Sequence, residues 1–125
     1  MIEVGHTQYQ RELRLLTPSH FENVFAKAIP AVSPKVTLLG KHNSLNHPRL
    51  GVTVSKKNVR KAHDRNRMKR LIRESFRLNQ QKLPNIDIVV VVKAGLDKQS
   101  NKEICKVLEK LWKKLTSRCN NASSS

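Results

Sequence analysis

The stretch Ile86-Asp87-Ile88-Val89-Val90-Val91-Val92 decides how the rest of the chain must fold. Six of its seven residues are β-branched, and they show no alternation of apolar and polar positions. Such a run is typical of a strand covered on both faces, because a half-exposed strand carries polar side chains at every second position. The sequence therefore predicts a central strand over residues 86–92, with the other elements packed around it.

Two further strands are expected on the N-terminal side of this run. Leu50, Val52 and Val54 alternate with small or polar residues, which is the pattern of a half-buried strand. Another strand is expected at about residues 35–41, before a polar turn over residues 42–48. We expect these two strands to pair directly as an antiparallel hairpin.

Three helices are expected around the strands. The first spans about residues 17–28, where a threonine followed by a proline forms a typical helix start. The second spans about residues 61–80, and its apolar residues gather on one side. These residues are Met68, Leu71, Ile72 and Phe76. The third opens at Ser100, where Glu103 has capping-box spacing. This order favours an α+β sandwich, a sheet covered by helices mainly on one face.

The chain carries a large positive charge. Its 125 residues include 25 lysines and arginines against nine aspartates and glutamates, a formal net charge of +16. Self-repulsion on this scale destabilises a compact state unless a polyanion screens it, so nucleic acid is the expected partner. The longest apolar run is Ile88–Val92, whereas a membrane-spanning helix needs about 20 apolar residues. We expect no membrane partner and, because the N-terminus lacks a signal-peptide core, a cytoplasmic location.

The length suits one domain with a modest core. Residues 1–13 are polar and aperiodic, and we expect them to form a disordered basic N-terminal arm. Residues 14–117 are expected to form the single domain, and residues 118–125 a flexible tail. Cys105 and Cys119 lack the spacing of metal ligands, so we expect both thiols to stay reduced.

Half of the net charge lies in 22 residues. The segment Lys56–Arg77 has ten basic residues against two acidic ones, a net +8. A basic row on the expected helix consists of Arg65, Lys69, Arg73 and Arg77, with Asn66 and Arg70 beside it. Like charges at this spacing repel by roughly a few tenths of a kcal/mol per pair, whereas phosphates would bind them and release counterions. Because acidic residues normally intersperse a solvated face, we favour polyanion binding over a solvated surface.

A family resemblance centres on this basic segment, which reads VRKAHDRNRMKRLIR from Val59 to Arg73. It resembles the signature of the bacterial ribonuclease P protein subunit, A-x-x-R-N-R-x-K-R. The similarity extends to Arg14–Thr17, to Arg49–Lys57 and to the strand at residues 86–92, so that it covers about residues 11–115. The motif is long and specific, and the resemblance identifies residues 14–117 as an RNA-binding domain.

The resemblance implies a more detailed fold. It implies a two-layer α/β sandwich of the ribosomal-protein-S5-domain-2-like type, in the order α-β-β-β-α-β-α. The mixed sheet would have about four strands and a left-handed β-α-β crossover around the basic helix. General statistics favour a right-handed crossover, so the expected hand depends on the resemblance.

The resemblance also implies a function. Family members are the protein subunit of ribonuclease P, which binds a catalytic RNA one to one and assists Mg²⁺-dependent removal of the 5′ leader from precursor tRNA. The RNA performs the hydrolysis and binds most of the Mg²⁺, and no protein partner is implied. The residues implied to bind the RNA subunit are Lys56, Lys57, Arg60, Lys61, Arg65, Asn66, Arg67, Lys69, Arg70 and Arg73. Those implied to bind the leader are Phe21, Phe25, Val36, Leu38 and Lys56.

One departure concerns the leader. Family members often carry an aromatic residue on the strand at about residues 36–39, where this chain has Val-Thr-Leu-Leu. Stacking of a base on an aromatic ring contributes about 1–3 kcal/mol. The expected grip on the leader through that strand is correspondingly weaker.

Catalysis by the protein itself is not expected. The nine acidic residues are scattered, and Asp64 and Glu74 lie ten residues apart on one helix, too far to share a metal ion. The five histidines show no metal-ligand spacing, so the sequence predicts neither catalytic residues nor a metal site on the protein. One non-enzymatic alternative stays open, a ribosomal-type RNA-binding protein or a DNA-binding protein that places residues 61–77 in a groove.

Overall fold

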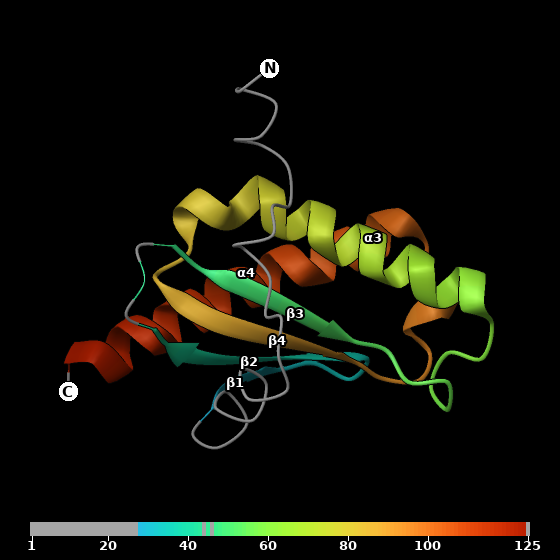
Figure 1. Cartoon of the computed structure of the whole chain (residues 1–125), viewed down its shortest axis with the longest axis horizontal. Helices are drawn as coiled ribbons and strands as arrows, with labels where there is room; N and C mark the ends of the chain where they lie inside the picture. Colours follow the sequence, from blue (N-terminus) through green and yellow to red (C-terminus); the bar gives the residue numbers. More distant parts are fainter. Residues whose placement is uncertain (1–27, 44, 46, 125) are drawn as a thin grey trace.

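The computed structural model of the chain describes residues 28–43, 45 and 47–124 (Figure 1). Their strands are β1 (Ile29–Val32), β2 (Val36–His42), β3 (Arg49–Thr53) and β4 (Ile86–Val92), and their long helices are α3 (Ala62–Asn79) and α4 (Asn101–Ser124). Two short 3₁₀ helices, η2 (Gln80–Lys82) and η3 (Leu96–Lys98), follow α3 and β4. The helix expected over residues 17–28, with Phe21 and Phe25, and the arm at residues 1–13 lie outside the described residues.

The four strands form one mixed sheet in the order β1-β2-β4-β3. β4 lies between β2, to which it is antiparallel, and β3, to which it is parallel. Six of its seven residues are buried, which confirms the central strand expected from its β-branched run. The expected hairpin of β2 and β3 is wrong, because β4 separates them. The most apolar strand takes the position where both faces and both edges are covered.

A crossover through α3 joins the parallel strands β3 and β4. α4 lies behind the sheet in Figure 1 and α3 packs beside it in the same layer, so the path from β3 through α3 into β4 is left-handed. The expected α+β class, with its mixed sheet of four strands, is confirmed.

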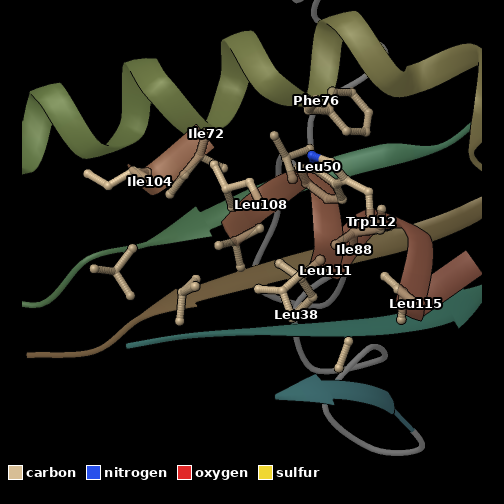
Figure 2. Close-up of a cluster of buried hydrophobic side chains, with 14 of the residues drawn as sticks. Leu38, Leu50, Ile72, Phe76, Ile88, Ile104, Leu108, Leu111, Trp112 and Leu115 are labelled. Carbon is tan, nitrogen blue, oxygen red and sulfur yellow. The ribbon is translucent and has the colours of Figure 1, made fainter. Parts of the chain in front are cut away.

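The main core lies between the sheet and the helical layer (Figure 2). Met68, Ile72 and Phe76 are fully buried on the inner side of α3, as the helical spacing predicted. Trp112 of α4 packs edge-to-face against Phe76, with ring centroids 6.1 Å apart. Its indole Nε1 donates to the buried Ser75 Oγ at 2.8 Å, so the one polar group of that ring is satisfied. This core fixes α3 against α4 as well as against the sheet.

The C-terminal boundary differs from the expectation. The prediction that a flexible tail begins at residue 118 is wrong. α4 continues to Ser124, and Cys119 is fully buried. Cys119 follows Leu115 by four residues and extends the apolar stripe by one turn. The His42 ring Nε2 also lies 3.1 Å from the Cys119 carbonyl oxygen, which ties this turn to β2.

Candidate nucleic-acid interface

The outer side of α3 presents a basic surface. Asn66, Arg70 and Arg73 are exposed and Lys69 is half-buried, and we call these four residues the α3 basic face. At 100° per residue they fall within about 100° of arc, opposite the buried stripe. Their short arc lets one nucleic-acid backbone reach all four side chains.

The two acidic residues of α3 do little to neutralise Lys69 and Arg70. The Glu74 carboxylate accepts two hydrogen bonds from the Arg77 guanidinium one turn away, and these bonds lower the pKa of Glu74. The Glu74 carboxylate thus neutralises the charge of Arg77. The other acid of α3, Asp64, is half-buried near the start of the helix. Within α3, neither acid is thus placed to neutralise Lys69 or Arg70.

Arg65 and Arg67 flank the buried stripe and bond to the protein itself. Arg65 Nη1 donates to the carbonyl oxygens of Val59 at 3.0 Å and Arg60 at 2.8 Å. Arg67 uses three nitrogens: Nε donates to Asn101 Oδ1 at 2.9 Å, Nη2 to the Gln99 carbonyl at 2.9 Å and Nη1 to the Asp97 carbonyl at 3.3 Å. The family resemblance grouped both with the residues that bind the RNA subunit, whereas their hydrogen bonds make them residues that position the neighbouring segments.

The segment before α3 is fixed by its own hydrogen bonds. The Asn58 amide Nδ2 donates to the Val92 carbonyl at 3.0 Å, its backbone N–H donates to Ser55 Oγ, and the side chain of Val59 is fully buried. The cations of this segment, Lys56, Lys57, Arg60 and Lys61, all stay exposed. The fold thus brings these four cations, predicted from sequence, to the N-terminal end of the α3 basic face.

Two hollows lie beside these cations. The first, of about 420 Å³, is lined by Lys57, Asn58, Arg60, Lys61, Asp64, Ala94, Gly95, Asp97 and Lys98. The second, of about 390 Å³, lies between Lys69 and the ends of β3 and β4, with Thr53, Ser55 and Val91 on its wall. Sequence reasoning missed Lys98, because only the turn at Gly95, with φ of +98°, returns that lysine toward residues 57–61. A glycine just after a buried strand was the available signal.

The predicted leader-binding residues on β2 are a correction. Val36 and Leu38 are both 0% exposed and belong to the core beneath the helices, so these two predictions are wrong. Side chains alternate along a strand, and their neighbours Thr37 and Leu39 point to the other face of the sheet. Lys56 is exposed, as its predicted role requires. Phe21 and Phe25 lie outside the described residues.

That other face is partly apolar. Val89 is fully buried there, and Ala28, Leu39 and Val91 pack around it half-buried. At its end, Asp87 accepts hydrogen bonds from Arg49 Nε at 2.8 Å, Arg49 Nη2 at 2.7 Å and Asn43 Nδ2 at 2.9 Å. These bonds raise the pKa of Arg49 and join β3 to β4. The charge inside the otherwise apolar β4 run is thus structural.

The described residues hold no group of three or more histidine, cysteine or acidic side chains that could bind a metal ion. In the first hollow, Asp64 and Asp97 stand among four cations, a donor set that does not suit Mg²⁺. In the same part of the chain, no helix is long and apolar enough to cross a membrane. The described residues of the site offer cations that can bind phosphates.

Comparison with known proteins agrees with this geometry. The family model described as Ribonuclease P matches residues 9–116. The chain belongs to the ribonuclease P protein family. As a ribonuclease P protein, it is the protein subunit of a ribonucleoprotein endoribonuclease that matures the 5′ end of tRNA, and its partner is RNA.

Relatives and solved structures support this assignment over most of the chain. The ribonuclease P protein component of Pseudoalteromonas atlantica is 66% identical over 116 residues, which are 93% of this chain and 97% of the relative. That of Cronobacter sakazakii is 57% identical over 106 residues, 85% of this chain and 89% of the relative. The Staphylococcus aureus ribonuclease P protein structure matches with a TM-score of 0.78 at 27% identity, covering 83% of this chain and 97% of that one. The Thermotoga maritima structure matches at 0.73 and 29%, covering 81% and 96%.

Proposed function

We propose that the protein binds one catalytic RNA through the α3 basic face and the cations of the preceding segment, and that it contacts the 5′ leader of precursor tRNA through a second set of residues, with Lys56 common to both sets. In this proposal the RNA-subunit contacts are Asn66, Lys69, Arg70, Arg73, Lys56, Lys57, Arg60 and Lys61. Arg65 and Arg67 hold this surface in shape. The observation that carries the proposal is that Arg70 and the four cations before α3 are exposed, while the Glu74 carboxylate on α3 is already paired with Arg77.

The chemistry of these side chains suits an RNA backbone. Arginine offers a planar fork that bonds two phosphate oxygens, and lysine offers a point charge. Each neutralised phosphate releases counterions, so the binding constant falls steeply with salt. Because the exposed cations occupy both α3 and the segment before it, they span two directions on the surface. Such an arrangement fits a folded RNA better than a single straight groove.

We place the leader on the sheet face that points away from α3 and α4. Phe21, Phe25 and Lys56 remain proposed leader contacts from the family resemblance. Thr37 and Leu39 are half-buried on this face, and we add them in place of their buried neighbours. Mg²⁺ would be held mainly by the RNA, in keeping with the cationic character of the protein's hollows. The assembly would act in the cytoplasm.

Reconstitution tests the function. The purified chain is added to a bacterial ribonuclease P RNA at low Mg²⁺ concentration, and cleavage of precursor tRNA is measured. We expect stimulation of cleavage, because added cations replace part of the Mg²⁺ that screens RNA phosphates. If no protein concentration stimulated cleavage, the proposed function would be rejected.

A variant locates the RNA contact. Arg70→Ala should weaken assembly with the RNA subunit and lower the slope of log K against log salt by about 0.7–0.9 for the lost phosphate contact. Lys82→Ala is the matched control, since Lys82 is an exposed cation on η2, away from the α3 basic face. Equal slopes for the two variants would contradict a phosphate role for Arg70.

A further inference from the structure

The outer side of α4 carries a second set of cations. Its five members are Lys102, Lys106, Lys110, Lys113 and Lys114, all exposed, and we call them the α4 lysine face. At 100° per residue they fall within about 120° of arc. The opposite side of the helix is buried, with Ile104, Leu108 and Leu115 fully covered by the core. Core packing thus directs all five lysines to the same side.

Two acidic residues offset only part of the charge of the five lysines. Only two acids, Glu103 and Glu109, lie on α4. Glu103 is engaged in the helix cap, where its carboxylate accepts hydrogen bonds from the Ser100 N–H at 3.0 Å and hydroxyl at 3.3 Å. No acid of the described residues lies within 4 Å of any of the five lysine nitrogens. Counting both acids, the face has a net charge of 5 − 2 = +3.

The arrangement costs the free protein stability. Lys102, Lys106, Lys110 and Lys114 form three consecutive like-charged pairs at i,i+4 spacing. Like charges at this spacing repel each other and disfavour the helix. A row of phosphates would convert this repulsion into attraction. Because lysine is a point charge without a rigid fork, the face suits a backbone contact that is independent of base sequence.

The position of the face identifies its partner. α3 and α4 pack side by side on one face of the sheet, and Arg67 bonds α3 to the residues that lead into α4. The two helices therefore belong to one layer with a fixed relative placement (Figure 1). The proposed leader surface lies on the opposite face of the sheet. An RNA that covers α3 is the nearest source of phosphates for α4.

We infer that the α4 lysine face is a second docking surface for the RNA subunit, which binds the backbone of a different RNA segment from the one on α3. The inference rests on the proposed function, since it takes the RNA on α3 to be the catalytic subunit. The lysines from residue 102 to residue 114 span about 18 Å at 1.5 Å per residue. That length accommodates several successive phosphates.

The double variant Lys106→Gln/Lys110→Gln tests the inference. Both residues are exposed, and glutamine matches lysine in helix propensity, so the fold is retained, as far-ultraviolet circular dichroism will verify. Binding of labelled RNA subunit is measured without substrate over a series of salt concentrations. We expect affinity to fall on the order of tenfold or more near 0.1 M salt, and the salt slope to fall by about 1.4–1.8. The control Lys41→Gln/Lys82→Gln removes the same charge from β2 and η2.

Hydroxyl-radical footprinting of the RNA subunit supplies the second measurement. We expect the α4 double variant to lose protection in a segment other than the one exposed by Arg70→Ala. The inference is overturned if the α4 variant behaves like its control, or if both variants lose the same nucleotides. It is also overturned if only precursor tRNA binding to the holoenzyme weakens. If Arg70→Ala also leaves RNA binding unchanged, the proposed function is rejected. If Arg70→Ala weakens RNA binding while the α4 double variant does not, only the second docking surface is rejected.

Discussion

Replacing Arg67 distinguishes two roles that an arginine of the basic motif can have, binding of RNA phosphates and positioning of neighbouring protein segments. Its guanidinium joins α3 to the segment before α4 through hydrogen bonds to Asp97, Gln99 and Asn101. We expect Arg67→Ala to destabilise the free protein, since these acceptors lose their donor. Replacement of a residue that only binds phosphate would leave the stability of the free protein unchanged.

The magnitude follows from the geometry. Two of the three bonds are 2.9 Å long and the third is 3.3 Å, so two are counted at full strength. A net contribution of about 0.5–1.5 kcal/mol per bond gives about 1–3 kcal/mol. We take about 1.5 kcal/mol, because Arg67 is half-buried and water can reach the vacated carbonyls. With a urea dependence of about 1–3 kcal/mol per M, the midpoint should fall by roughly 0.5–1.5 M.

Urea unfolding followed by circular dichroism measures this loss. Arg70→Ala is the matched variant three residues away, on the exposed side of the same helix. It should leave the free energy of unfolding within about 0.5 kcal/mol of the parent while weakening RNA binding. Arg67→Lys should lie between parent and alanine variant, because one ammonium cannot reach all three acceptors. A midpoint for Arg67→Ala equal to that of the parent would refute the positioning role.

Two further predictions concern the interior. Asp87→Ala should lower the free energy of unfolding by about 2–3 kcal/mol in the same assay, because it leaves the Arg49 charge without its partner at a site where the two side chains are only 19% and 11% exposed; a loss below about 0.5 kcal/mol would contradict this. Iodoacetamide at pH 8 should modify Cys105 before Cys119 in the folded protein, as followed by mass spectrometry. Burial raises the pKa of the Cys119 thiol and so lowers its thiolate fraction at that pH, while Cys105 is half-buried. Equal rates would show that the last turns of α4 open readily.

The local sequence pattern predicted helices and strands, but it did not predict which strands lie side by side. The β-branched run of β4 and the apolar stripe of α3 each identify an element and its buried side, because burial and periodicity are properties of a short segment. Strand pairing depends on competition for the centre of the sheet. β2 and β3 are adjacent in sequence, yet β4 displaces their direct pairing. The same limit explains Val36 and Leu38, whose face is set by which side of the sheet α4 covers.

The candidate site shows the same division. The cations of residues 56–73 could be found from charge and spacing, and the structure keeps Lys56, Asn66 and Arg70 exposed. The positioning role of Arg67 could not, because its hydrogen-bond partners include Asp97 and Gln99, 30 and 32 residues away in sequence. The partners of Arg65 are local carbonyls, and only the path of the chain before α3 brings them within reach. Lys98 joins the site for the same reason, through the turn at Gly95.

The sequence by itself determined the charge, its concentration in one helix and the motif that places the chain in the ribonuclease P protein family. These are local properties, which can be determined without knowing which helices and strands are neighbours in the fold. Only the tertiary structure decided which basic residues face outward and which bind the protein's own carbonyls. It also decided that α3 and α4 share one layer. The physical reason is that each guanidinium binds whichever acceptor the fold brings within hydrogen-bonding distance, and that distance is set by long-range packing of the core.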